Sequence, residues 1–390
     1  MPRLSTAAPS VLLLASIALS ACDSQKPDPA PSETVAAAPS FTVPMASSDP
    51  APGQPAPQED AARPVMQAQV VLDRLGFSPG IIDGKTGLST TNALNGFQKA
   101  NDLAVTGKFD DATMQALGRW SNIAATRVVT IPDDFAQGNF APLPKDPAEQ
   151  AKLPEIGYTS LEEKLAERFH TTPDVLRGLN PPLAEQAAAR AHAEQQSKAL
   201  NPPTANPLPP EPYRAGLQLR VPNVGGDQID PAKVDNKGWL ATLATLGVSD
   251  AQPDAARIVV SKSKGTLEAY DKSDKLVAVF TVTTGSSHDP LPLGEWKING
   301  MSYNPEFSYD ASLFWDVPDS KGEHLLPPGP NGPVGVVWID LSREHYGIHG
   351  TPEPQTIGRA ESHGCVRLTN WDAARLAQMV SGSTKVSFVK

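Results

Sequence analysis

Proline limits what this chain can fold into more than any other residue does, because its ring fixes the φ angle and removes a backbone hydrogen-bond donor. The 390-residue sequence contains 40 prolines, about twice the usual share. In residues 22–63, proline is joined mainly by alanine, serine, threonine and aspartate, without a helical or strand period. Such a composition buries too little apolar surface to offset the entropy of ordering. We therefore predict a disordered tether here, which at about 3.1 Å per residue reaches at most roughly 120 Å.

The segment before the tether predicts export. Arg3 precedes an apolar run over residues 11–19, which is shorter than the roughly 20 residues of a membrane-spanning helix. The run leads into Leu-Ser-Ala-Cys at Cys22, which resembles the lipobox of bacterial lipoproteins. The resemblance implies a signal peptide over residues 1–21 and a lipid on Cys22. The alternative is an ordinary signal peptide that leaves Cys22 free.

A lipid on Cys22 implies a cell-envelope protein that faces the periplasm and is anchored in a membrane. Asp23 follows this cysteine and resembles the inner-membrane retention signal of enteric bacteria. That rule transfers poorly between bacteria, so the choice between inner and outer membrane stays open.

Charge and cysteine content exclude several classes of protein. Lys and Arg total 33 against 43 Asp and Glu, a net charge of −10, which argues against a nucleic-acid partner because such proteins usually carry a basic face. The two cysteines, Cys22 and Cys365, exclude a disulfide-rich scaffold and a four-cysteine zinc site.

Residues 64–118 are predicted to form a small helical domain. Apolar residues recur at helical spacing over 65–75, and Gly76 then ends the helix. A turn with an aspartate and a helix follow, and a shorter echo of this pattern runs over 107–117. The motifs LGF, G-x-x-D-G, A-L-x-x-F-Q and V-T-G resemble the three-helix peptidoglycan-binding domain. A generic three-helix bundle is the alternative.

Residues 119–254 are predicted to be a Pro-rich linker with one ordered segment. A helix over 160–169 and a strand over 216–222 flank the motif TTPDVLRGLNP. This order resembles a LysM-type glycan-binding module over 155–224, interrupted by an Ala/Gln-rich insert at 183–212. The alternative is a brace between domains that binds no ligand. Both N-terminal modules are expected to bind the wall separately and so concentrate substrate.

Residues 255–390 are predicted to form a β-rich domain. Short runs of β-branched and apolar residues alternate with turn signals, which favours a sandwich or a barrel-like sheet. An apolar-periodic segment over 370–380 predicts a closing helix. The expected fold class is therefore multidomain α+β, with helical modules before a β-rich, sandwich-like domain.

A thiol with histidines nearby makes this last domain the candidate catalytic one. Cys365 supplies a thiol, His349 a base sixteen positions earlier, and Gly350 and Gly364 allow close approach of the backbone. A buried structural thiol is one alternative. A zinc site of His345, His349 and Cys365 is another, but two glycines around His349 disfavour the helix that this spacing needs.

The motifs HGT at 349–351 and SHGCVRL at 362–368 resemble the YkuD L,D-transpeptidase catalytic domain. The resemblance implies that Cys365 is the nucleophile and His349 the proton acceptor and donor. It places Gly364, with the Cys365 amide, in the oxyanion site. It also implies that Ser362, His363 and Arg367 orient the site and its substrate. Neither a metal nor a cofactor is implied.

The resemblance implies a cysteine acyltransferase that acts on peptidoglycan stem peptides. The thiol attacks the third residue of a donor tetrapeptide, D-alanine leaves, and an amine accepts the acyl group in a 3→3 link. The acceptor stays open: another stem, a lysine of an anchored outer-membrane protein, a free D-amino acid, or water. A non-catalytic lipoprotein that anchors the wall is the second hypothesis, and the intact pair of His349 and Cys365 favours the enzyme.

Overall fold

The computed structural model describes residues 62–199, 211–226, 229–313 and 318–390, which belong to one compact unit. The predicted signal peptide, the lipidated Cys22 and nearly all of the predicted tether lie outside the described residues, as do residues 200–210 of the predicted insert. None of the described helices is both long and apolar enough to cross a bilayer.

The predicted N-terminal helical domain is present. It contains the helices α1 (Pro64–Arg74), α2 (Leu88–Ala100) and α3 (Asp111–Leu117). Pro64 suits the first turn of α1, where its missing N–H costs no hydrogen bond. The Asp110 carboxylate caps α3 by accepting from the Thr113 amide. Leu72 and Phe97 are fully buried where the helices meet, so the apolar period read from the sequence is the packing face.

The middle segment is more ordered than the expected linker. The strands β1 (Thr126–Thr130) and β2 (Gln218–Pro222) pair in antiparallel fashion. Between them lie the helices α4 (Pro147–Gln150), α5 (Leu161–Arg168), α6 (Pro173–Leu179) and α7 (Pro181–Ala199). The side chains of Ser160 and Thr172 cap α5 and α6. The first part of the predicted insert is therefore the helix α7, and the strand β1 was missed because it lies outside the predicted module.

The C-terminal domain is built on a curled sheet. In the described residues, eight strands follow the order β11-β10-β9-β6-β12-β3-β4-β5. They are β3 (Arg257–Ser261), β4 (Thr266–Tyr270), β5 (Leu276–Thr281), β6 (Gly294–Tyr303), β9 (Val337–Leu341), β10 (Gly347–His349), β11 (Val366–Arg367) and β12 (Lys385–Val389). The strands β7 (Phe307–Asp310) and β8 (Glu323–Leu326) form a separate hairpin.

The two edges of this sheet meet. Thr283, just past β5, forms a bridge to Arg367 in β11, with N–O distances of 3.1 and 2.9 Å for the two backbone hydrogen bonds. The β-rich fold predicted from the sequence is thus confirmed in its barrel-like form.

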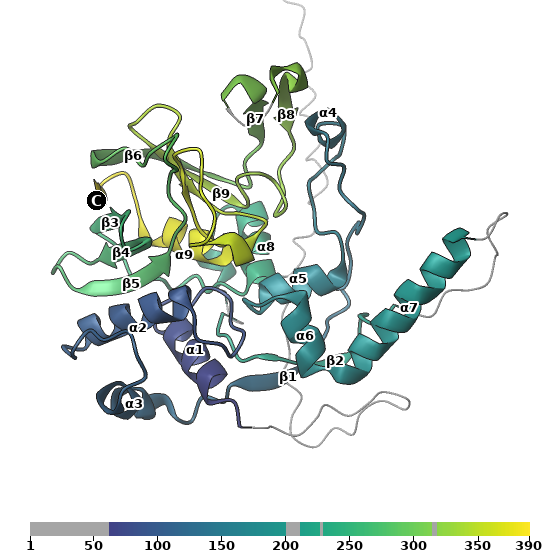
Figure 1. The fold of residues 1–390 in the computed structure, drawn as a ribbon, viewed down its shortest axis with the longest axis horizontal. Coiled ribbons are helices and arrows are strands. Elements are labelled where there is room, and N and C mark those ends of the chain that lie inside the picture. The colour runs from purple at the N-terminus through teal and green to yellow at the C-terminus, as the bar shows by residue number, and fades with distance from the viewer. Residues whose placement is uncertain (1–61, 200–210, 227–228, 314–317) are drawn as a thin grey trace, which may run out of the picture. The chain divides into compact units, whose positions relative to one another are not determined.

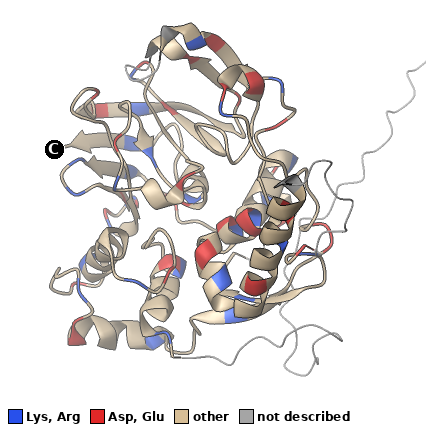
Figure 2. Ribbon diagram, turned by 45° about the vertical axis from the view of Figure 1, so that its right-hand side comes forward, with Lys and Arg blue, Asp and Glu red and all other residues tan. Residues whose placement is uncertain are grey.

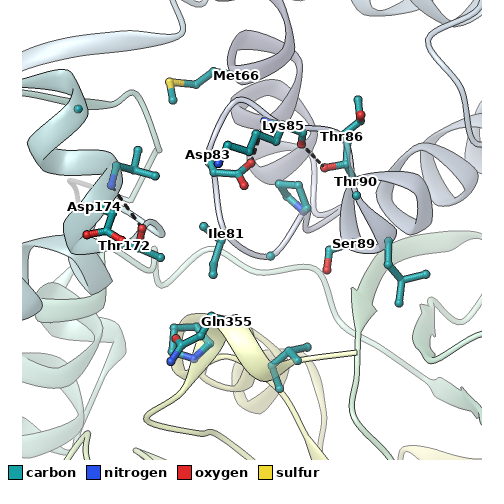
Figure 3. Close-up of a pocket in the computed structure, with 18 of the residues that line it drawn as sticks. Met66, Ile81, Asp83, Lys85, Thr86, Ser89, Thr90, Thr172, Asp174 and Gln355 are labelled. Atoms are coloured by element: carbon teal, nitrogen blue, oxygen red, sulfur yellow. Dashed lines mark hydrogen bonds between the residues drawn. The ribbon is translucent and has the colours of Figure 1, made fainter. Parts of the chain in front are cut away.

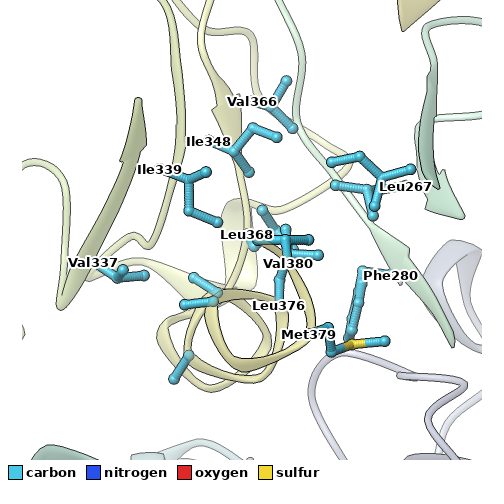
Figure 4. Packing of buried hydrophobic residues seen from close by; sticks show 14 of the residues in the cluster. Leu267, Phe280, Val337, Ile339, Ile348, Val366, Leu368, Leu376, Met379 and Val380 are labelled. Carbon is cyan, nitrogen blue, oxygen red and sulfur yellow. The ribbon is translucent and has the colours of Figure 1, made fainter. Parts of the chain in front are cut away.

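Two helices complete the core of the C-terminal domain. They are α8 (Lys237–Leu246) and α9 (Asn370–Met379), and Trp239, Leu243, Trp371 and Leu376 are buried against the sheet. Figure 4 shows Leu376 and Met379 of α9 gathered with Phe280 and Leu368 in this cluster. The closing helix was expected from its apolar period, whereas α8 was not recognised.

The N-terminal helices pack directly on the catalytic sheet, contrary to the expectation of separate modules (Figure 1). Residues 76–78 pair with the edge strand β5: the Ser78 amide donates to Val279 O at 2.9 Å, and the Val279 amide donates to Gly76 O at 3.0 Å. Gly76 has a φ of +88°, and a Cβ there would lie 2.9 Å from Val277 O. Glycine is therefore needed both for the turn and for the close approach.

A buried imidazole links the middle segment to both neighbours. The Nδ1 of His170 lies 3.2 Å from an Asp73 oxygen in α1, and its Nε2 lies 3.0 Å from the Leu246 carbonyl at the end of α8. The ring stacks on Trp371 of α9 at 5.1 Å between centroids. All three segments therefore share one interior.

Candidate active site

The short strands β10 and β11 bring the predicted catalytic residues together. They pair in parallel, with His349 opposite Arg367 and Ile348 opposite Val366. Cys365 directly precedes β11 and therefore lies beside Gly347, at the start of β10. The Leu368 amide also donates to His349 O at 2.9 Å, which fixes the register beyond the strand.

The thiol of Cys365 is only partly exposed and is protonated at rest. Its Sγ lies 3.8 Å from the carbonyl oxygen of His345, toward which the thiol donates. Burial raises the pKa of the Cys365 thiol, and a backbone hydrogen bond from Gly347 and the charge of Arg367 offset this only in part. Sulfur therefore needs a base before it can act as a nucleophile.

His349 has the geometry of that base. Its side chain is buried and stacks on Trp338 at 5.4 Å between ring centroids. Its Nδ1 lies 2.7 Å from the carbonyl oxygen of Gly350. Because a carbonyl only accepts hydrogen bonds, Nδ1 carries the proton and Nε2 is left as the acceptor. Burial, with the nearby charge of Arg367, lowers the pKa of His349 to about 4, so the ring is neutral at pH 7.

The residues that precede Cys365 form a backbone turn, and contacts within the site fix its conformation. The Ser362 hydroxyl donates to the carbonyl of Cys365 at 2.7 Å. Gly364 has a φ of +101°, and a Cβ there would lie 2.5 Å from the ring of Tyr346, so only glycine fits. His363 is partly buried on the same turn, and Arg367 lies in β11.

The structure offers no support for the zinc alternative. The side chain of His345 is exposed and lies 3.6 Å from Glu344, so this residue approaches the thiol only through its backbone. Among the described residues, no group of three or more His, Cys, Asp or Glu is arranged to hold a metal ion.

A supporting layer behind His349 was missed by the sequence analysis. The side chain of Asn370, at the start of α9, donates to Glu167 in α5 at 2.8 Å and to the Pro330 carbonyl at 3.0 Å. Its Oδ1 is packed so closely on Gly335 and Gly350 that a Cβ at these glycines would lie 1.9 and 2.2 Å from it. The carbonyl that orients His349 is therefore held in place by α5 and α9. Glu167 and Asn370 are 203 residues apart, and no local motif marks the pair.

Comparison with known proteins agrees with this geometry. Residues 255–387 match the family model described as "L,D-transpeptidase catalytic domain", and residues 62–117 match "Putative peptidoglycan binding domain". A "Putative L,D-transpeptidase YkuD" of Bacillus licheniformis is 33% identical over 174 residues, which cover 45% of this chain and 85% of the relative. The protein of the same description from Bacillus subtilis is 50% identical over 146 residues, which cover 37% of this chain and 73% of the relative. The chain belongs to the YkuD family of L,D-transpeptidases.

Solved structures of other L,D-transpeptidases are more distant. The enzyme from Mycobacterium smegmatis is 20% identical with a TM-score of 0.29, and the match covers 34% of this chain and 58% of that one. L,D-transpeptidase 3 from Mycobacterium tuberculosis is 19% identical with a TM-score of 0.26, and the match covers 35% of this chain and 60% of that one.

Membership of the L,D-transpeptidase family makes the protein a transferase whose catalytic domain follows a peptidoglycan-binding domain. The main prediction from the sequence, a peptidoglycan L,D-transpeptidase, is confirmed at this level, and peptidoglycan is its partner. The roles of individual residues follow from the site geometry and are argued next.

Proposed function

We propose that this L,D-transpeptidase works by a cysteine mechanism in which His349 is the general base and Cys365 the nucleophile. The observation that carries the proposal is the hydrogen bond of His349 Nδ1 to Gly350 O, on the strand that pairs with the segment of Cys365. This bond leaves Nε2 free to accept a proton. The base and the thiol are both uncharged at rest, so the proton moves only as the substrate reacts.

The first half-reaction forms a thioester. As Sγ attacks the carbonyl of the third residue of a donor tetrapeptide, His349 Nε2 takes the thiol proton. The bond to the terminal D-alanine then breaks, and the imidazolium returns the proton to the leaving amine. Backbone amides at Gly364 and Cys365 are the donors that we assign to the developing oxyanion.

The second half-reaction transfers the acyl group. An acceptor amine attacks the thioester, His349 takes a proton from it, and the sulfur leaves and is reprotonated. The amine is that of a diamino acid on another stem in our proposal, which gives a 3→3 link. A lysine of an outer-membrane protein, a D-amino acid and water are the competing acceptors, and the product distinguishes them.

The envelope location and the middle module belong to the same proposal. We infer export and a lipid anchor on Cys22 from the lipobox-like residues 19–22. A LysM-like role for the middle segment is supported by its helices α5 and α6 between the paired strands β1 and β2. The alternative of a non-catalytic wall anchor is disfavoured, because a neutral, oriented base beside a thiol has no role in anchoring.

Mass spectrometry tests the proposal directly. The full chain is incubated with purified disaccharide-tetrapeptide, and the products are analysed for released D-alanine and for a dimer one D-alanine lighter than two substrates. Cys365→Ala should abolish both products, while Cys22→Ala, which alters the other thiol, should keep both. A folded Cys365→Ala protein with normal turnover would refute the mechanism. A folded wild-type chain that releases no D-alanine would favour the wall anchor.

A further inference from the structure

A cleft of about 720 Å³ lies apart from the two catalytic side chains and is lined by all three segments of the chain. The N-terminal domain, the start of α6 and the loop after β10 each contribute to it. Figure 3 shows Gln355 facing the loop of Ile81, Asp83 and Lys85, with Thr172 and Asp174 at one side. Gln355 belongs to the segment that connects His349 with Cys365. The cleft therefore exists only because the domains pack together.

Unpaired positive charge distinguishes this cleft. Arg63, Lys85 and Arg359 line it, and none of them forms an ion pair within the described part of the chain. The Nε of Arg63 is buried without a hydrogen-bond partner there. Of the two acidic residues of the lining, Asp174 pairs with Arg177 at 2.9 Å. Asp83 accepts from two uncharged groups, the Lys85 amide at 2.8 Å and the Gln69 side chain at 3.1 Å, so the lining holds three cations against one carboxylate without a cationic partner.

This local charge runs against the rest of the protein. The sequence carries a net charge of −10, and residues of both signs are interspersed along the ribbon in Figure 2. Three cations, two from the N-terminal domain and one from the C-terminal domain, line this one cleft and therefore favour an anionic ligand.

The remaining lining indicates a peptide rather than a sugar. The described residues that line the cleft include no aromatic side chain on which a sugar ring could stack. They do offer the hydroxyls of Thr86, Ser89 and Thr172, the amide of Gln355 and apolar side chains such as Ile81. This combination suits a short peptide that carries carboxylates and small apolar groups.

We propose that this cleft is a second substrate-recognition site that binds the stem peptide of a peptidoglycan strand through its free carboxylates. The inference rests on the proposed function, because it takes peptidoglycan stems as the substrate. Its occupant touches the loop that connects the catalytic residues. Gly358 of that loop donates to Thr283 Oγ1 at 2.9 Å, and Thr283 pairs with Arg367, two residues after the nucleophile. Binding in the cleft thus attaches a wall strand to the loop that leads to the reacting thiol.

Calorimetry of the full chain tests this site. Cys365 is first alkylated so that the probe, purified disaccharide-tetrapeptide, cannot acylate the enzyme. The exposed side chains of Lys85 and Arg359 are then changed. Lys85→Gln and Arg359→Gln should each weaken binding about threefold and together about tenfold, as expected for solvent-accessible ion pairs. Binding to the unsubstituted chain should also weaken as salt increases.

Matched control variants distinguish the loss of a cation in the cleft from the loss of a cation elsewhere on the surface. Lys272→Gln and Arg119→Gln remove exposed cations that do not line the cleft, and both should bind the probe as the unsubstituted chain does. Gln355→Ala supplies an uncharged third variant, which should also bind more weakly. Thermal unfolding of each variant confirms that it is folded.

Two results would overturn the inference. Equal affinity of the Lys85→Gln/Arg359→Gln double variant and the controls would place binding elsewhere. If the double variant lost affinity for glycan strands whose peptides have been removed by an amidase as much as for the probe, the cleft would recognise sugar instead. The proposed function fails on a different readout, the release of D-alanine by the untreated enzyme. The two failures are therefore distinguishable.

Discussion

Asp73 on α1 and Arg375 on α9 form a two-pronged ion pair across 302 residues of sequence, with N–O distances of 2.8 and 2.7 Å. Both side chains are buried. Burial alone would raise the pKa of Asp73, but the charges of Arg375 and His170 and hydrogen bonds from both hold it well below its usual value. The first and last helices of the described fold are thus joined by a charge pair that neither domain could bury alone.

Loss of this carboxylate should destabilise the whole unit. Asp73→Ala leaves the buried Arg375 with only its longer contact to Asp372, at 3.8 Å, so the free energy of unfolding should fall by about 3–5 kcal/mol in chemical denaturation. Asp133→Ala, an exposed control, should change it by no more than about 0.5 kcal/mol. Adding Arg375→Leu to Asp73→Ala should recover part of the loss. A cost below about 1 kcal/mol would mean that the pair does not hold the domains together.

Glu167 should make stability depend on pH in the opposite direction from an ordinary carboxylate. Burial raises its pKa to about 7, although Tyr158 and Asn370 donate to it. The folded state therefore favours the protonated acid. This contribution to stability is fully present below the pKa of 4.5 that the carboxyl has in the unfolded chain, and it is lost as pH rises through 7.

Glu167→Gln should remove that pH dependence. At pH 8 the variant should be more stable than the original chain by up to about 3 kcal/mol, because no buried charge has to form. Denaturation curves collected from pH 4 to 8 measure the effect, with the exposed Glu185→Gln as the control. Parallel pH profiles of the variant and the original chain would contradict the shifted acid.

The resting thiol should alkylate slowly at neutral pH. The pKa of Cys365 is raised above its ordinary value by burial, so the thiol is almost wholly protonated at pH 7. The rate of reaction with iodoacetamide should therefore keep rising beyond pH 9. A plateau near pH 7 would indicate a preformed thiolate–imidazolium pair and contradict the neutral resting state.

His349 should determine both the size of kcat/KM and the acid limb of its pH profile. His349→Ala should lower kcat/KM by roughly 10²–10⁴-fold, the usual contribution of a positioned base. In the original enzyme the acid limb of the pH profile should lie near pH 4, because the ring loses its base function only when protonated. His363→Ala should cost less, and the exposed His192→Ala should cost nothing. An acid limb near pH 6.5 would show that another histidine is the base.

Removal of the N-terminal modules should disrupt the catalytic domain. A chain that starts at residue 229 keeps α8 but loses Asp73 and exposes the apolar face of Val279 and Leu276 that packs on Phe97 and its neighbours. We expect this fragment to aggregate or unfold in size-exclusion chromatography and circular dichroism. A chain that starts at residue 62 is the control and should remain folded and active. A monomeric, active fragment from residue 229 would restore the picture of separate modules.

Local signals explain what the sequence could predict. Cys365 and His349 lie in short motifs, and the helix α9 shows an apolar period, so these features could be found without a structure. The helical domain was equally visible from its turns and from residues such as Asp110 that cap helices.

The features that the sequence could not predict depend on contacts between residues far apart along the chain. Asn370 and Glu167 look like ordinary polar residues of two helices, and only the fold brings them together behind Gly350. The separate-module expectation failed for the same reason. Phe77 and Asp73 read as parts of a self-contained helical domain, because nothing in a local pattern shows that a face will be buried against another domain.

The covered edge of β5 bears on how such a chain can be inherited. Residues 76–78 occupy backbone groups that would otherwise offer an open template to any extended strand. A gene rearrangement that encoded the catalytic sheet without α1 and the turn after it would leave the edge of β5 exposed. The resulting protein would be prone to aggregation. The helical domain and the sheet therefore have to be inherited together, even though a segment of more than one hundred residues separates them along the chain.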